Sequence, residues 1–135
     1  MGITDTGRFV EAKLTGVTAN QKKRCVDLFI TDTSSQNWHL VANEVQDFMV
    51  IEMRLQNIID RMILWGSSDE IECRRRLFCM LYGYRPSAED NMYLPTINNN
   101  FMALKQEGYH LLEIEPVFGA LIFILAKHLQ IEKAR

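Results

Sequence analysis

The chain has 135 residues, of which 47% are hydrophobic and 24% are charged. This length and composition are typical of a single globular domain spanning residues 1–135, and they exclude a disordered chain. The formal net charge of −2 provides no overall field that would draw the protein to nucleic acid or to an anionic membrane.

Cysteine usage and the N-terminus predict a soluble, cytoplasmic protein. Cys25, Cys73 and Cys79 are odd in number and not closely paired, which argues against a disulfide framework and for reduced thiols. The first residues lack the apolar stretch of a secretory signal. We therefore expect a cytoplasmic domain that contains no membrane segment.

Antiparallel strands are predicted mainly in residues 8–65. Alternating apolar and polar side chains, rich in β-branched and aromatic residues, indicate strands with one buried face. Such strands are expected at 8–17, 24–33 and 38–45, with polar turns at 18–23 and 32–37.

The segment 48–65 fits two structures. Its first half alternates as a strand does, but Leu55, Ile58, Ile59, Met62 and Ile63 in its second half also have helical spacing. One helix over 38–64 would far exceed the usual helix length. One or two strands are therefore favoured over a helix.

Helices are predicted mainly in residues 67–107. The first covers 67–83, where Ser67 and Glu70 fit a capping box and Gly83 is placed to end the helix. Two i,i+4 ion pairs are expected along it, Glu70–Arg74 and Glu72–Arg76. The second helix covers 95–108 with Thr96 as its cap, and a strand follows at 109–115.

Residues 116–126 read PVFGALIFILA, with no polar side chain from Val117 to Ala126. A membrane-spanning helix needs about 20 apolar residues, so this shorter run belongs to a protein core. A helix begun at Pro116 is favoured for 116–130, because the missing N–H of proline costs nothing in the first turn. The alternative is a central strand after a turn at Gly119. These elements together predict an α+β fold.

Catalytic and cofactor signatures are missing from the sequence. It contains no C-x-x-C or H-x-H pair for a metal, no G-x-S-x-G and no glycine-rich phosphate loop. We therefore expect no catalytic residue, metal or cofactor. The second alternative function is an enzymatic or small-molecule site gathered from distant segments around His39 and His110, since catalytic groups need not be close in sequence.

The first alternative to the favoured function is a winged-helix-like DNA-binding regulator that uses residues 95–115. A polar first turn with Asn98, Asn99 and Asn100, followed by a glycine and a strand, is the order of a recognition helix and its wing. The acidic net charge and the weak helical pattern before residue 94 argue against it, so nucleic acid is not the expected partner.

The favoured function is a non-catalytic protein-interaction domain, with an inhibitor, immunity-type or adaptor role compatible with the sequence. Tyrosine and arginine are enriched at protein interfaces, and several gather around residues 82–93. The candidate contact residues are Tyr82, Tyr84, Arg85 and Tyr93. A homodimer is also expected to be possible, because the apolar content is high for the length.

Overall fold

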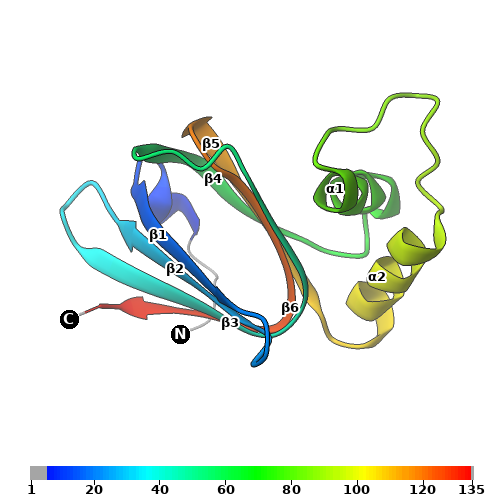
Figure 1. Cartoon of the computed structure of the whole chain (residues 1–135), viewed down its shortest axis with the longest axis horizontal. Coiled ribbons are helices and arrows are strands. Elements are labelled where there is room, and N and C mark those ends of the chain that lie inside the picture. The colour runs from blue at the N-terminus through cyan, green and yellow to red at the C-terminus, as the bar shows by residue number, and fades with distance from the viewer. Residues whose placement is uncertain (1–5, 135) are drawn as a thin grey trace.

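The protein is built around a closed antiparallel β-barrel (Figure 1). The computed structural model describes residues 6–134, and within this range six strands close in the order β1-β2-β3-β6-β5-β4. These strands are β1 (Lys13–Asn20), β2 (Cys25–Thr31), β3 (Asn37–Ile51), β4 (Asn57–Trp65), β5 (His110–Phe118) and β6 (Leu121–Lys133). A short 3₁₀ helix, η1 (Thr6–Phe9), precedes β1.

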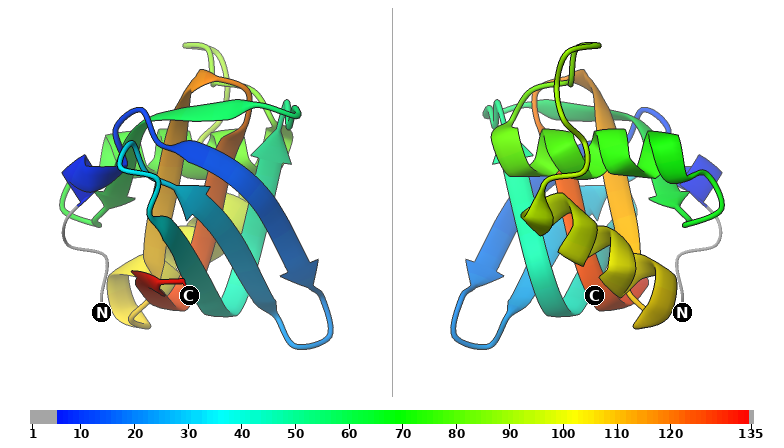
Figure 2. Two further views of the ribbon diagram at one scale, coloured as in Figure 1. Left: turned by 90° about the vertical axis from the view of Figure 1, so that its left-hand side faces the viewer. Right: turned by 90° about the vertical axis from the view of Figure 1, so that its right-hand side faces the viewer.

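Two helices lie between β4 and β5 and cover one wall of the barrel. They are α1 (Glu70–Tyr82) and α2 (Pro95–Gln106). Figure 2 shows both helices in front of the wall that contains β5 and β6. The expected α+β class is therefore wrong, because the sheet closes on itself and also takes in the C-terminal segment. The helices form an outer layer on this barrel.

The helix favoured for 116–130 is also wrong. β5 continues through Pro116 to Phe118, Gly119 turns with a φ of +91°, and β6 begins at Leu121. The run looked helical because a strand that is buried on both faces has no alternating pattern. Residues 122–126 are all buried. Their side chains point alternately into the barrel and towards the helices. The segment is therefore the alternative that the sequence left open, a strand after a turn at Gly119.

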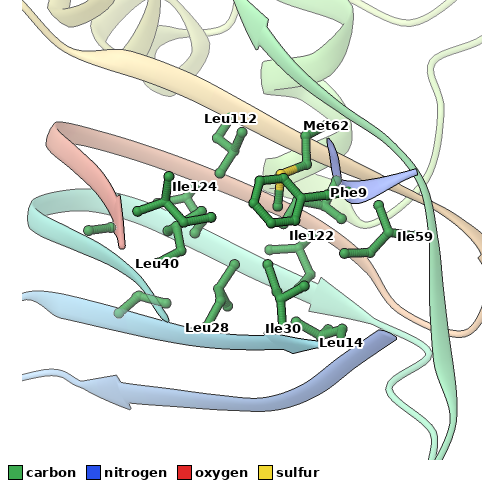
Figure 3. Packing of buried hydrophobic residues seen from close by; sticks show 14 of the residues in the cluster. Phe9, Leu14, Leu28, Ile30, Leu40, Ile59, Met62, Leu112, Ile122 and Ile124 are labelled. Carbon is green, nitrogen blue, oxygen red and sulfur yellow. The ribbon is translucent and has the colours of Figure 1, made fainter. Parts of the chain in front are cut away.

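The interior of the barrel is an apolar core to which every strand contributes. Its fully buried side chains include Leu14 of β1, Leu28 and Ile30 of β2, Leu40 of β3, Ile59 of β4, Leu112 of β5, and Ile122 and Ile124 of β6. Figure 3 shows these side chains converging, with Phe9 of η1 closing one side. We call this set the barrel core.

A second cluster fills the space between the helices and the barrel wall. It joins Cys73, Leu77 and Phe78 of α1 and Ile97 and Phe101 of α2 to Leu111, Phe123 and Leu125 of the wall. We call this set the helix-layer core. β5 and β6 lie between the two cores, because their alternate side chains belong to one or the other.

The ends of the helices differ slightly from the sequence expectation. Asp69, rather than Ser67, caps α1, and its side chain accepts a hydrogen bond from the Glu72 N–H at 3.4 Å. Gly83 ends α1 in the left-handed conformation, as expected. α2 starts with Pro95 in its first turn and has no side-chain cap, so Thr96 does not serve as one.

A buried asparagine ties together two turns at one end of the barrel. Asn57 is 2% exposed, and its Oδ1 accepts hydrogen bonds from the N–H groups of Arg54 and Ala120, both at 3.0 Å. Its Nδ2 donates to the Arg54 carbonyl at 2.7 Å. A Cβ at Gly119 would lie 2.3 Å from the Asn57 Oδ1, so this contact requires glycine.

In the described range 6–134, no helix combines the length and the apolar character needed to cross a bilayer.

Candidate interaction site

Tyr82 and Tyr84 form an aromatic cluster with Phe78 at the C-terminal end of α1. The Phe78 ring lies 4.7 Å from that of Tyr82 and 5.5 Å from that of Tyr84, and the two tyrosine rings are 6.1 Å apart. Phe78 is buried, while Tyr82 is 46% and Tyr84 54% exposed. The buried phenylalanine therefore holds two amphipathic rings at the surface in a fixed arrangement.

Arg85 lies between two hollows beside this cluster. One hollow, of about 260 Å³, lies between α1 and the wall and is lined by Arg75, Arg76, Cys79, Arg85 and Glu113 among others. The second, also about 260 Å³, is lined by Ile51, Glu52, Tyr84, Arg85 and Gly119 among others. We call the first the arginine hollow and the second the tyrosine hollow. Arg85 is exposed and lines both.

The floor of the arginine hollow contains a buried carboxylate. Glu113 of β5 is 2% exposed and accepts a hydrogen bond from the Trp65 Nε1 at 2.8 Å. The Arg76 Nε lies 3.5 Å from the same oxygen, and the Arg76 guanidinium stacks 4.3 Å from the Trp65 ring. Arg76 also pairs with Glu72, as the i,i+4 spacing predicted. The charge of Arg76 is therefore already balanced by Glu72 and Glu113 of the same chain.

Arg75 and Arg85 are the two exposed arginines that line the arginine hollow. Arg75 forms a long 3.8 Å ion pair with Glu72, and its side chain is 50% exposed. Arg85 is close enough to Cys79 to lower its pKa, although burial outweighs this effect and raises the pKa of the Cys79 thiol overall. The rim of the hollow thus presents guanidinium groups that can donate to an anionic group of a ligand.

Tyr93, the fourth sequence candidate, has a different environment. It is 55% exposed, and its ring lies 4.3 Å from the guanidinium carbon of Arg74 rather than in the Phe78 cluster. The same guanidinium lies 4.6 Å from the Phe101 ring. Tyr93 therefore belongs to the contact between α1 and α2, and its role in binding stays a prediction.

Arg74 is a structural residue. Its side chain is 9% exposed and binds Glu70 at 3.1 Å, the second i,i+4 pair that the sequence predicted. It also donates to the Met92 carbonyl at 3.2 Å and to the Asn98 Oδ1 at 2.6 Å. The three consecutive arginines of α1 thus divide into a buried one, an exposed one and one over a tryptophan.

The asparagines of α2 are mostly engaged inside the protein. Asn98 accepts from Arg74 and donates to the Tyr93 carbonyl at 2.9 Å. Asn100 is buried and accepts from the Gln46 Nε2 of β3 at 2.7 Å. Asn99 is exposed. β5, which would have to be the first strand of a wing, is an internal strand of the barrel, so the fold does not favour the winged-helix alternative.

His39 and His110 do not come together in a site. The His39 Nε2 lies 2.7 Å from the Asp27 Oδ1, and its ring stacks on Phe29 at 4.8 Å, on the outer surface of β2 and β3. His110 is exposed on β5 opposite Ala126 of β6. Across residues 6–134, no group of three His, Cys, Asp or Glu side chains is arranged to hold a metal ion.

Sequence reasoning missed Glu113 and Arg75 as parts of the hollow. A weak signal for Glu113 was available, since it is the one charged residue in the buried segment 111–114. Such a residue requires a partner, but its partner Trp65 is 48 positions away.

No family model, no curated protein and no solved structure matches this chain.

Proposed function

We propose that this chain is a protein-binding module that contacts its partner through Tyr82, Tyr84 and Arg85. The observation that carries the proposal is the position of Arg85 between two hollows and beside two half-exposed tyrosines. Rigid aromatic rings next to an arginine are the side chains that contribute most to binding energy at interfaces.

The chemistry of the surface favours a partner segment with an acidic side chain beside an apolar one. The carboxylate would meet Arg85 and Arg75 at the rim of the arginine hollow, where guanidinium groups can bind it with two hydrogen bonds. The apolar neighbour would cover Tyr84 and enter the tyrosine hollow. Tyr82 and Tyr84 lose little conformational freedom on binding, because Phe78 already packs against both rings.

Affinity capture from native lysate with matched variants tests this proposal. We expect Arg85→Glu and Tyr84→Ala to lose a protein that the wild type retains, because each removes one half of the surface. Phe29→Ala is the control, since Phe29 is a 39% exposed aromatic residue on β2, away from the helices. Its variant should retain the same protein.

The proposal is wrong if the retained protein is the same for the wild type and for both site variants. Thermal unfolding of each variant must show an unchanged midpoint, so that lost binding cannot be attributed to lost folding. Arg85→Lys refines the result, because it keeps the charge but not the two-pronged geometry, and should weaken binding less than Arg85→Glu.

A further inference from the structure

The second half of β3 has a strand on one side and none on the other. Residues 38–42 of β3 pair with β2 on one edge and with β6 on the other. Within the described residues, 47–51 pair with β6 alone. In the left view of Figure 2 the arrow of β3 stands at the margin of the barrel. We call residues 46–51 on this side the open β3 edge.

The backbone direction along the open β3 edge follows from its hydrogen bonds. The Phe48 N–H donates to the Asp47 Oδ1 at 2.8 Å, so it points away from β6. Pairing with β6 is regular from Asp47 to Ile51. Because backbone groups alternate in direction along a strand, the backbone N–H of Val50 also points to the open side, where no strand of residues 6–134 pairs with it.

The side chains of the open β3 edge leave it poorly protected against pairing. Phe48 and Val50 pack on the barrel core, and Met49 packs on the helix-layer core, but all three remain only partly buried. Natural edge strands are usually protected by lysine, proline, an inward charge or a β-bulge, and the bulge between Val45 and Asp47 lies only at the start of this edge. Residues 45–51 contain no lysine or proline, and Asp47 is their one charged residue.

We propose that the open β3 edge pairs in antiparallel fashion with the same edge of a second copy of this chain. A two-fold axis at Met49 places Phe48 opposite Val50 of the second copy, so both outward-pointing residues of each strand form backbone hydrogen bonds. Ile51 then lies opposite Asp47 of the second copy. This interface shares Ile51 with the lining of the tyrosine hollow, but it does not use Tyr82, Tyr84 or Arg85 and it has a different occupant, so it goes beyond the proposed function.

A second copy is the occupant that fits because this edge is complementary to itself. A two-fold interface requires one patch to match its own copy, and here apolar side chains face apolar side chains with no like charges opposite each other. In the register centred on Met49, the backbone groups of Phe48 and Val50 form the hydrogen bonds to the second copy. This register leaves Val45 free to keep its hydrogen bond to the Arg24 carbonyl at 2.9 Å.

In the separate chain, Asp47 occupies one backbone donor of the open β3 edge. Its carboxylate occupies the Phe48 N–H, and in the pair a carbonyl of the second copy takes this place. Burial already raises the pKa of Asp47, although the Phe48 hydrogen bond opposes the shift. The carboxylate is therefore partly removed from water before any partner arrives, which reduces the further cost of covering it.

Sedimentation equilibrium of the purified chain tests the proposal with two variants at one position. Ile51→Lys and Ile51→Glu remove the same packing but place opposite charges beside Asp47 of the second copy. Because cross-strand charge pairs attract or repel and each pair occurs twice in the dimer, we expect the lysine variant to dimerise at least about tenfold more tightly. Asp47→Lys combined with Ile51→Glu should restore the affinity.

Two results would overturn the proposal. One is a monomeric mass for the wild type at every concentration, and the other is a dimer whose affinity is equal in the two Ile51 variants. If both variants fail to fold, amide exchange at Val50 in the wild type replaces them. Protection that rises with protein concentration is expected, and protection independent of concentration contradicts the pairing. The purified chain contains no partner protein, so neither result tests the binding of a partner to Tyr82, Tyr84 and Arg85.

Discussion

The barrel core and the helix-layer core are held together in different ways. All the side chains that close the barrel core are apolar, and the strands around it join through backbone hydrogen bonds. The helix layer combines an apolar cluster with buried charges, Arg74 between two aromatic rings and Glu113 beneath Trp65. The strands of the barrel are thus joined by backbone hydrogen bonds, whereas the helices pack on its wall through side chains.

This difference determines which part of the molecule unfolds locally first. Hydrogen bonds of a closed barrel must break together, but side-chain contacts of an outer layer can be lost locally. The candidate interaction surface lies on the helix layer, the less firmly attached of the two. The following predictions test whether the two regions respond separately.

The largest effect is expected from truncating a buried leucine in each region. Leu40 of the barrel and Leu77 of α1 are both 0% exposed, so alanine should lower the free energy of unfolding by about 3 kcal/mol in either case. Hydrogen exchange distinguishes them. Leu77→Ala should raise exchange in α1 and α2 while the barrel stays protected, whereas Leu40→Ala should raise it throughout. Identical exchange patterns would show one cooperative unit.

A smaller effect is expected from Arg74→Met. The variant loses the contacts to Glu70, Met92 and Asn98 and leaves partly buried acceptors without a donor, at a cost of about 2 kcal/mol in urea unfolding. Arg75→Met is the matched control, because Arg75 is the exposed neighbour on the same helix, and it should change stability by less than about 0.5 kcal/mol. Equal losses would refute a structural role specific to Arg74.

The smallest effect concerns the thiols and leaves stability unchanged. Burial raises the pKa of Cys73 to about 11, so at pH 8 about one thiol in a thousand is ionised. Cys25 is partly exposed, while Cys73 and Cys79 are buried in the helix layer. With Ellman's reagent at pH 8, Cys25 should react first, and the other two only as the helix layer opens. Simultaneous reaction of all three would contradict this order.

Features set by neighbours in the sequence could be predicted. The position of α1, its end at Gly83 and its two ion pairs depend on residues within one or two turns of each other. The strands of the first half were visible for the same reason, since alternation is local. For 48–65 the strand choice agrees with β3 and β4, and Leu55 lies in the connection between them.

Features that depend on distant partners could not be predicted. β5 and β6 carry apolar side chains on both faces because the helices cover the outside of the barrel, and this covering is invisible within the segment itself. Closure of the barrel depends on pairing of Lys13 and Leu14 with β4, a contact that no local pattern indicates. The arginine hollow likewise unites α1 with β5. Tyr82, Tyr84 and Arg85 were selected from composition alone, and their role in binding stays a prediction.

Trp65, the last residue of β4, pairs with Leu111 near the start of β5. Since the end of β4 lies directly opposite the start of β5, the entire helix layer is an insertion into a β-hairpin. Replacing it with a tight turn would preserve the strand pairing of the barrel. The same deletion would expose Phe123 and Leu125 to water, so a shortened chain would need polar substitutions on the outer face of β6 to stay in solution.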